Sequence, residues 1–254
     1  MKACMLASGS EGNVTYIETS NHKMLFDAGT NARYINTKLM EINHSLDEIE
    51  YIFITHVHDD HIKALKGIIK KYKPTICLSP KMFSELDILK DYENIILFDE
   101  KVTLDSVTID IIKTSHDTSD SRSFIIREDN KSIVYLTDTG YINQKFFSKL
   151  TNCNVYLFES NHDVEMLLNG PYPKWLKDRV MGPYGHLSNK DSSIYLAKLI
   201  GDNTQKIILT HLSQHNNTEE KAMETIKEIF NEYNIDFTNI NCARQKEKSE
   251  LIEI

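Results

Sequence analysis

The sequence predicts a single α/β domain spanning residues 1–254, and three observations support this fold class. Short apolar runs rich in β-branched residues alternate with amphipathic runs from one end of the chain to the other. No Gly/Ser-rich linker, low-complexity stretch or internal repeat interrupts the alternation. A length of 254 residues with 41% hydrophobic content is enough to build one large core, which excludes disordered and fibrous classes.

The apolar runs, which are rich in Val, Ile, Tyr and Phe, predict β-strands. They are Met1–Ala7, Thr15–Glu18, Met24–Phe26, Tyr51–Thr55, Thr75–Leu78, Asn94–Phe98, Val107–Thr114, Ser123–Arg127, Ser132–Leu136, Val155–Phe158, Lys206–Leu209 and Ile235–Asn239. Several of them end directly before a histidine or an aspartate. A loop at a strand end is a common place for ligands, so these ends are the first candidates for a functional site.

The amphipathic runs have apolar residues at three- and four-residue spacing and predict helices. They are Ala32–Glu41, Ile62–Tyr72, Lys81–Tyr92, Gln144–Leu150, Val164–Asn169, Pro173–Val180, Asn189–Ile200 and Glu219–Glu232. Two of these runs have good start signals, because Ser188 precedes one and Thr218 precedes the other.

The charge and the cysteines limit the classes of protein that fit. The net charge of -8 excludes a broadly basic nucleic-acid coat, although bound divalent metals and a short basic segment can reverse the potential locally. The four cysteines lie far apart, with no C-x-x-C pair, which fits a reducing compartment. No apolar run approaches the roughly 18 residues of a membrane helix, and the start lacks a signal sequence. We therefore expect a cytoplasmic protein without a membrane partner.

Histidines and aspartates cluster in the run His56-Val57-His58-Asp59-Asp60-His61, between the apolar strand YIFIT and the helical run IKALKGIIKKY. His56 and His58 are two apart in an extended turn and can point into one site. Asp60 and His61 begin the helix and can face a second site nearby. The alternative is a polar loop with surface histidines, but chance rarely produces three imidazoles and a carboxylate at strand-to-helix spacing. The run therefore predicts a metal site, with room for two ions.

Further ligands are expected at other strand ends, because zinc and related ions take imidazole and carboxylate ligands and a catalytic site leaves one position open for water. His116, Asp138 and His211 each follow an apolar strand. Any one of them alone could be a loop residue exposed to solvent, but together they predict further ligands. Three other histidines have no comparable context, and we expect His22 and His44 at the surface. His215, four residues after His211, could face the site, but we expect it in a loop.

The H-x-H-x-D-H run with the later His, Asp and His resembles the metallo-β-lactamase fold superfamily over nearly the whole chain. This resemblance implies a four-layer αββα sandwich with two metals at one edge of its sheets. The implied ligands are His56, His58 and His116 for one metal and Asp60, His61 and His211 for the other, with Asp138 bridging them. Asp27 of the string LFDAG is similar to the carboxylate that this family places behind its ligand histidines.

Spacing separates the branches of that superfamily. Only 22 residues separate His116 from Asp138, too few for the protruding arm of tRNA-processing relatives. The 73 residues from Asp138 to His211 are too few for the β-CASP insertion of RNA-cleaving relatives. Asp138 itself argues against the secreted β-lactamases, which lack that bridging carboxylate.

Several local strings resemble the YycJ/WalJ-type branch: LASGSEGNVTYIE, THVHDDHIKAL, LTDTGYI, FESNHDVEML, NGPYPKWLKDRVMGPYGHLSN and LTHLSQHNN. That branch implies a 5′-to-3′ exonuclease acting on DNA, a role in mismatch repair, and a dinuclear centre that uses Mn²⁺ or Zn²⁺. One element departs from it, because Asp120–Ser123 stands where the family has a Pro-x-Gly element after His116-Asp117.

Two alternatives therefore remain at this point. One is a hydrolase of small substrates on the same fold, such as a cyclic nucleotide phosphodiesterase or a lactone or thioester hydrolase, which the net charge of -8 favours. The other is a metal-dependent sensor that has lost turnover, which the seven intact ligand positions oppose.

The resemblance implies that two metals convert water to hydroxide and neutralise the phosphate under attack, with Asp60 and Asp138 orienting the hydroxide. The leaving group then needs an acid that is not a metal ligand, and Glu159 with His186 is the best candidate pair. The alternative for His186 is a polar loop that caps a helix. His162, in the string ESNHD, could share the task or hold the loop.

Two segments are candidates for substrate contact. In SGSEGN, the glycines permit a tight turn, so that Ser10 and Asn13 either meet a phosphate or order the site, and a plain β-turn is the alternative. The string GPYPKWLKDRVMGPYGH carries a basic face beside aromatic residues that could stack bases or grip a backbone, with a solvated face as the alternative. Its basic residues are Lys174, Lys177 and Arg179, and its aromatic residues are Tyr172, Trp175 and Tyr184.

Overall fold

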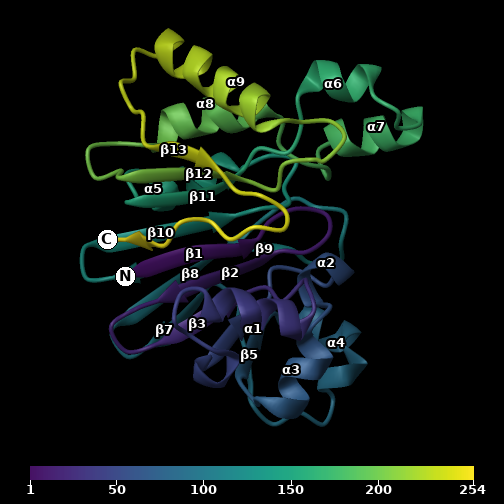
Figure 1. The fold of residues 1–254 in the computed structure, drawn as a ribbon, viewed down its shortest axis with the longest axis vertical. Helices are drawn as coiled ribbons and strands as arrows, with labels where there is room; N and C mark the ends of the chain where they lie inside the picture. Colours follow the sequence, from purple (N-terminus) through teal and green to yellow (C-terminus); the bar gives the residue numbers. More distant parts are fainter. The chain divides into compact units, whose positions relative to one another are not determined.

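The computed structural model describes residues 1–254 (Figure 1). The chain divides into two compact units. The first contains residues 1–111, 118–122 and 244–254, and the second contains residues 112–117 and 123–243. No helix is both long enough and apolar enough to cross a membrane.

The first unit is built on a mixed sheet in the order β14-β1-β2-β3-β4-β5-β6. The strands of this sheet are β1 (Lys2–Ala7), β2 (Val14–Glu18), β3 (Lys23–Phe26), β4 (Tyr51–Phe53), β5 (Thr75–Leu78), β6 (Ile95–Leu97) and β14 (Ile252–Glu253). The pairs from β14 to β3 are antiparallel, and the pairs from β3 to β6 are parallel. A hairpin of β7 (Lys101–Leu104) and β8 (Val107–Lys113) follows the sheet in the chain.

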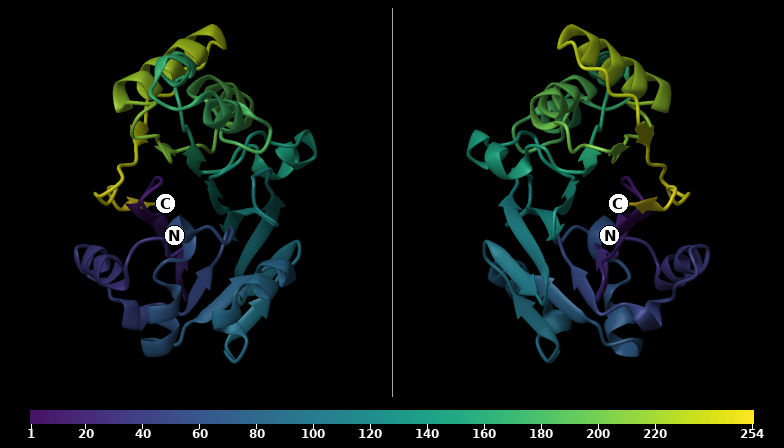
Figure 2. Two further views of the ribbon diagram at one scale, coloured as in Figure 1. Left: turned by 90° about the vertical axis from the view of Figure 1, so that its right-hand side faces the viewer. Right: turned by 90° about the vertical axis from the view of Figure 1, so that its left-hand side faces the viewer.

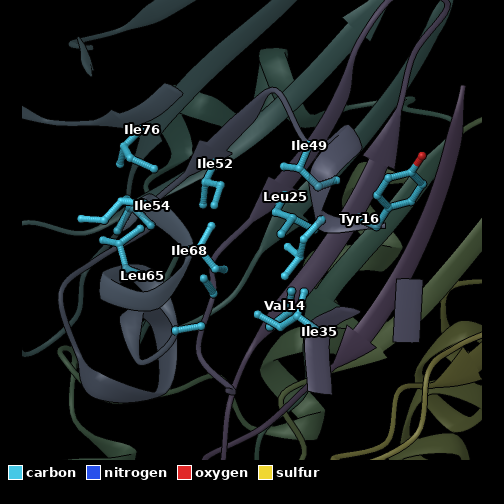
Figure 3. Close-up of a cluster of buried hydrophobic side chains, with 14 of the residues drawn as sticks. Val14, Tyr16, Leu25, Ile35, Ile49, Ile52, Ile54, Leu65, Ile68 and Ile76 are labelled. Carbon is cyan, nitrogen blue, oxygen red and sulfur yellow. The ribbon is translucent and has the colours of Figure 1, made fainter. Parts of the chain in front are cut away.

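Helices cover one face of this sheet, where alternate strand residues form a core (Figure 3). Val14, Leu25, Ile52 and Ile76 of the strands point toward the helices. The helical elements of the unit are α1 (Ala32–Met40), η1 (Leu46–Glu48), α2 (Asp59–Ile62), α3 (Leu65–Lys71), α4 (Pro80–Glu85) and η2 (Asp87–Leu89). The largest buried side chains of the cluster include Tyr16, whose hydroxyl donates a 2.8 Å hydrogen bond to Glu18.

The second unit contains five strands in the order β13-β12-β11-β10-β9. They are β9 (Arg122–Glu128), β10 (Lys131–Leu136), β11 (Val155–Glu159), β12 (Lys206–Thr210) and β13 (Ile240–Cys242). The pairs from β10 to β13 are parallel, and β9 pairs with β10 in the antiparallel direction. The carboxyl ends of β10, β11 and β12 therefore meet at one edge of this sheet.

Helices α8 and α9 pack on this sheet and on each other (Figures 1 and 2). The helical elements of the unit are η3 (Gln144–Phe146), α5 (Phe147–Leu150), α6 (Val164–Asn169), α7 (Lys174–Met181), α8 (Asn189–Leu199) and α9 (Glu219–Glu232). The predicted caps are confirmed, because Ser188 accepts from the amide of Asp191 and Thr218 accepts from the amide of Lys221. Leu196, Ile226 and Phe230 bury the inner faces of these two helices.

Most predicted elements are confirmed to within a few residues, but four are corrected. The helix predicted over Ile62–Tyr72 is split into α2 and α3, the one over Lys81–Tyr92 into α4 and η2, and the one over Gln144–Leu150 into η3 and α5. The strand predicted over Ile235–Asn239 is wrong, because Asn234 has a φ of 56° and the amide of Ile235 donates back to Phe230 to close α9. Pairing with β12 begins only at Ile240. The strands β7 and β14 were not predicted.

The expectation that His22 lies at the surface is wrong. It is only 8% exposed, and its ring lies between two carboxylates, at 3.0 Å from Glu50 and 3.0 Å from Asp105. These contacts tie the turn between β2 and β3 to the hairpin turn between β7 and β8. The sequence gives no sign of this, because both acidic partners are distant along the chain.

Candidate metal centre

In the first unit, the parallel strands β3 and β4 end side by side and bring Asp27 next to Thr55. The register pairs Phe26 with Phe53, and the amide of Asp27 donates a 2.8 Å hydrogen bond to the carbonyl of Phe53. Asp27 then leaves the strand with a φ of 62°, a left-handed conformation that aspartate tolerates better than most residues. The turn aims its carboxylate back at the histidine run that follows β4.

The carboxylate of Asp27 is fully buried and organises this run. It accepts from the amide of Thr55 at 2.9 Å, and its Oδ2 lies 2.8 Å from Nδ1 of His61. A histidine whose Nδ1 is held by a carboxylate presents its Nε2 as a ligand nitrogen, and the carboxylate makes that nitrogen more basic. This geometry places Asp27 directly behind the predicted ligand His61.

His56 and His58 face each other as two donors of one site. The Nε2 atom of His56 lies 3.1 Å from Nδ1 of His58, while the other ring nitrogen of His56 lies 3.0 Å from Oγ1 of Thr55. Two imidazole ligands at 2.0–2.1 Å from a tetrahedral zinc ion lie about 3.3 Å apart. The spacing of the pair is therefore compatible with two ligands of one such metal, and their role as ligands stays a prediction.

The turn between β1 and β2 supports the same group of residues. Gly9 and Gly12 both have positive φ, at 135° and 153°, so the tight turn is confirmed. The amide of Gly9 donates to Oδ1 of Asn13, and the amide of Gly12 donates to the carbonyl of Gly9. These two N–H groups are therefore already used inside the turn.

Asn13 is buried and orders the ligand run from this turn. Its Nδ2 lies 3.0 Å from Nε2 of His61 and 3.5 Å from a carboxylate oxygen of Asp60. Its amide also donates to the carbonyl of Asp60 at 2.8 Å. Of the two residues predicted to contact substrate from this turn, Ser10 is exposed, whereas Asn13 is buried and contacts the predicted ligands Asp60 and His61.

In the second unit, three predicted site residues come from the adjacent ends of β10, β11 and β12. Asp138 follows β10, Glu159 ends β11 and His211 follows β12, and the register pairs Glu159 with Thr210. With His186 they form a cluster whose candidate ligand atoms all lie within 4.8 Å of one another. Asp138 and His211 have φ of 54° and 57°, so each strand ends in a left-handed residue, as at Asp27.

Glu159 is the centre of this cluster and is fully buried. Its Oε1 lies 2.7 Å from Nδ1 of His186 and 3.1 Å from Nδ1 of His211. Its Oε2 accepts from the amide of Thr139 at 3.0 Å. Burial alone would raise the pKa of Glu159, but the charge and hydrogen bond of His186 and the hydrogen bond of His211 outweigh it and lower the pKa. The carboxylate is therefore ionised and orients both rings.

The loop that carries His186 also positions His116. Nδ1 of His116 lies 3.2 Å from the carbonyl of Gly185, and its Nε2 lies 3.3 Å from Oδ1 of Asp117 and 3.8 Å from Oδ1 of Asp138. A carbonyl partner of this kind fixes the tautomer of a ligand histidine. Burial is the main cause that lowers the pKa of His116, so the ring is held neutral, as metal binding requires.

His162 is buried below the same loop, and its Nδ1 has no hydrogen-bond partner. Burial, and after it the charge of His186, lower the pKa of His162 to about 4. Its carbonyl accepts from the amide of Asn189 at 2.8 Å. These contacts favour the prediction that His162 holds the loop.

Sequence reasoning missed a network of buried amides behind the second cluster. The side chains of Asn189 and Asn217 exchange two hydrogen bonds of 2.8 Å, and Ser160 donates to Asn189 at 2.7 Å. Asn161 donates at 2.9 Å to the carbonyl of His211. These asparagines join the loops of Glu159, His186 and His211. Asparagine in a loop is ordinarily a turn residue, so the sequence carried no clear signal for them.

The predicted basic residues lie on or beside α7. Lys174 is exposed, Lys177 donates a 2.7 Å hydrogen bond to the carbonyl of Leu168, and Arg179 forms an ion pair with Asp117. The altered segment after His116 is stabilised differently from a Pro-x-Gly turn, since Arg122 forms a 3.0 Å ion pair with the buried Asp120.

Comparison with known proteins identifies relatives of this chain. The family model described as a β-lactamase superfamily domain matches residues 22–212. The chain is 36% identical over 232 residues to exodeoxyribonuclease WalJ of Streptococcus pneumoniae, covering 89% of this chain and 86% of that protein. It is 31% identical over 233 residues to exodeoxyribonuclease YycJ of Bacillus anthracis, covering 90% and 88%.

A solved structure confirms the fold. The metallo-β-lactamase fold protein YhfI of Bacillus subtilis has a TM-score of 0.72 at 16% identity and covers 98% of both chains. The predicted α/β sandwich of the metallo-β-lactamase type is therefore confirmed.

Proposed function

This chain belongs to the β-lactamase superfamily and, within it, to the group of exodeoxyribonucleases WalJ and YycJ, and from that membership we propose that it is a metal-dependent hydrolase that degrades DNA from an end. The observation that carries the proposal is the hydrogen bond between His186 and Glu159, next to the candidate metal ligands Asp138 and His211. This pair can protonate an alkoxide leaving group, which phosphodiester cleavage needs.

The chain's own donor atoms support the binding of divalent metals. We assign His56, His58, Asp60 and His61 of the first unit and His116, Asp138 and His211 of the second as ligands, and we propose two ions, Zn²⁺ or Mn²⁺, per chain. The close approach of His56 and His58 and the cluster of donors around Asp138 both fit this chemistry. When bound, such ions supply a nucleophilic water and neutralise the charge of the phosphate.

His186 acts as the general acid in this proposal. Its Nδ1 hydrogen bond to Glu159 leaves Nε2 available to hold a proton for the departing oxygen. Glu159 keeps the ring oriented and stabilises its protonated form, because the carboxylate is buried and ionised. Asp60 and Asp138 orient the attacking water.

The substrate is DNA, held by residues near the second cluster. We propose that Lys174, Lys177 and Arg179 meet the phosphate backbone and that Ser10 contacts a phosphate from the first unit. Asn13 would act through Asp60 and His61. Because no cysteine is in a disulfide, the proposed place of action is the reducing cytoplasm.

The test is digestion of end-labelled linear duplex, single-stranded and covalently closed circular DNA with added Mn²⁺ or Zn²⁺. Loss of the 5′ label from linear DNA with intact circles is the expected result. Bis-p-nitrophenyl phosphate and a cyclic dinucleotide serve as comparison substrates. Hydrolysis of these small diesters alone would overturn the assignment to DNA and favour a small-substrate phosphodiesterase.

A further inference from the structure

Helix α7 carries several exposed side chains, and we define the α7 face as Lys174, Trp175, Arg179 and the following Tyr184. No residue of α7 is buried. Trp175 is 66% exposed, and Tyr184, just after the helix, is 63% exposed. Figure 1 shows α7 beside α6, away from the core helices α8 and α9 of its unit. A helix without a buried face is not held in place by a core of its own.

Contacts at its C-terminal end hold α7 against the candidate catalytic residues instead. The amide of His186 donates to the carbonyl of Val180 at 2.9 Å. Ser115 donates a 2.7 Å hydrogen bond to the carbonyl of Pro183. Gly140, two residues after Asp138, packs so tightly that an added Cβ would lie 2.4 Å from that same carbonyl. The position of α7 is therefore set by the loops that carry the site.

Tyr184 lies at the rim of the second cluster as a consequence. It stands between Pro183, which contacts Ser115, and Gly185, whose carbonyl lies 3.2 Å from the predicted ligand His116. His186, the proposed acid, is two residues further on. Tyr184 is therefore an exposed aromatic residue two residues from the proposed acid.

Trp175 extends the same face outward along the helix. It is four residues before Arg179, so the two side chains lie on one side of α7, about 6 Å apart along its axis. Arg179 is ion-paired with Asp117, the neighbour of His116. The face thus continues from the candidate ligand through Arg179 to Trp175.

The chemistry of this face fits a single strand of nucleic acid. Its two exposed aromatic rings accompany two exposed cations, Lys174 and Arg179, in a protein of net charge -8. Aromatic rings stack on unpaired bases, while lysine and arginine neutralise the backbone. An apolar protein partner would desolvate Lys174 and the ion pair of Arg179 with Asp117.

We propose that the α7 face binds the unpaired bases of a DNA end, with Tyr184 stacking on the base nearest the scissile phosphate and Trp175 on a base further along the strand. This inference rests on the proposed exonuclease function. It implies that the enzyme acts on a single-stranded or frayed end. Stacking on two rings selects against a closed duplex, because paired bases do not expose their faces.

The test uses the single tryptophan of the chain as its probe. The metal-loaded protein is titrated with a phosphorothioate dT oligonucleotide, which resists hydrolysis, and the fluorescence of Trp175 is followed together with the anisotropy of the labelled oligonucleotide. We expect saturable quenching with the same dissociation constant in both signals. Tyr184→Ala and Trp175→Ala should each weaken binding about tenfold or more, whereas Tyr233→Ala, an exposed tyrosine next to α9, should bind as the parent does.

The outcomes separate this inference from the exonuclease function. Binding without a change in Trp175 fluorescence, or equal affinity of Tyr184→Ala and the parent, would overturn the proposed face even if the 5′ label is released from linear DNA. Quenching with the expected loss in both variants would support the face. If no DNA is then degraded, the exonuclease function is wrong and the binding site stands.

Discussion

His186 donates its Nδ1 proton toward a carboxylate that has no exposed surface, and the distance to Oε1 of Glu159 is 2.7 Å. The same oxygen lies 3.1 Å from His211, so one buried charge orients both the proposed acid and a proposed ligand. A change at Glu159 should therefore affect both the proposed acid and the proposed ligand. The two roles can be tested separately, because His186 and His211 are different residues that contact the same carboxylate.

Replacing the proposed acid should slow the reaction without removing metal. We expect His186→Ala to lower kcat on linear DNA by about 10²- to 10⁴-fold, since a positioned general acid contributes an acceleration of that size. Metal content measured by mass spectrometry should stay at the parental level. Glu159→Gln should also lower kcat, because a neutral amide no longer stabilises the protonated ring. Full activity of His186→Ala would show that the acid assignment is wrong, and loss of metal would make His186 a ligand.

The buried amide pair should be important for stability. Asn217→Leu removes the partner of Asn189 and the donor to the carbonyl of Ser160, while the carbonyl of Asn161 still accepts from the amide of Ser213. We expect a loss of about 2–4 kcal/mol in the free energy of unfolding, because unsatisfied buried polar groups cost 1–3 kcal/mol each. Urea denaturation measures this. Asn231→Ala, an exposed asparagine on α9, is the control and should change little. Equal stabilities of the two variants would contradict the network.

Gly29 allows the chain to pass directly beside the ligand run. A Cβ at this position would lie 1.6 Å from the carbonyl of Asp60. Gly29→Ala should therefore destabilise the protein by about 3 kcal/mol or more and reduce its metal content by displacing Asp60. Gly67→Ala is the matched control, since nothing lies near its Cβ and it sits in α3; it should stabilise by about 0.5–1 kcal/mol. A well-folded Gly29→Ala protein with full metal content would refute this packing.

Acid should destabilise the protein partly through His162. Its pKa is about 4 in the native state against about 6.5 in an unfolded chain. Between these values the unfolded chain binds a proton that the native state does not, so the free energy of unfolding falls as the pH is lowered from 6.5 to 4. His162→Gln should have a shallower slope in this window, by up to about 1.4 kcal/mol per pH unit. Urea denaturation in chelator at several pH values compares the two proteins, and identical slopes would exclude this contribution.

The strands and the grouping of the predicted site residues could be predicted from the sequence, because both depend on local patterns. Apolar runs with β-branched residues mark the strands, and parallel strands place whatever follows them at one edge of a sheet. Asp138, Glu159 and His211 follow such strands and do lie together. Interruptions of helices were missed, as at Ile62–Tyr72, where one periodic run became two helices. The short strands β7 and β14 were missed too, and the strand predicted over Ile235–Asn239 is absent.

The supporting contacts could not be predicted, because they depend on backbone conformation and distant partners. The left-handed conformations of Asp27, Asp138 and His211 leave no trace in residue type. The pairing of Asn189 with Asn217 requires the β12–α9 loop to meet the start of α8. The contact of the buried His22 with Asp105 could not be predicted for the same reason, since an isolated histidine in a turn does not indicate a distant partner.

The most direct test of metal-dependent DNA degradation is the rate at which 5′ label leaves linear DNA after chelation and after return of Mn²⁺ or Zn²⁺. We predict no release in chelator, restored release by the parent, and little release by His58→Ala, which should also have lost metal; His215→Ala, a histidine outside the ligand set, should behave as the parent. Release that continues in chelator, or that His58→Ala supports at the parental rate, would contradict the account.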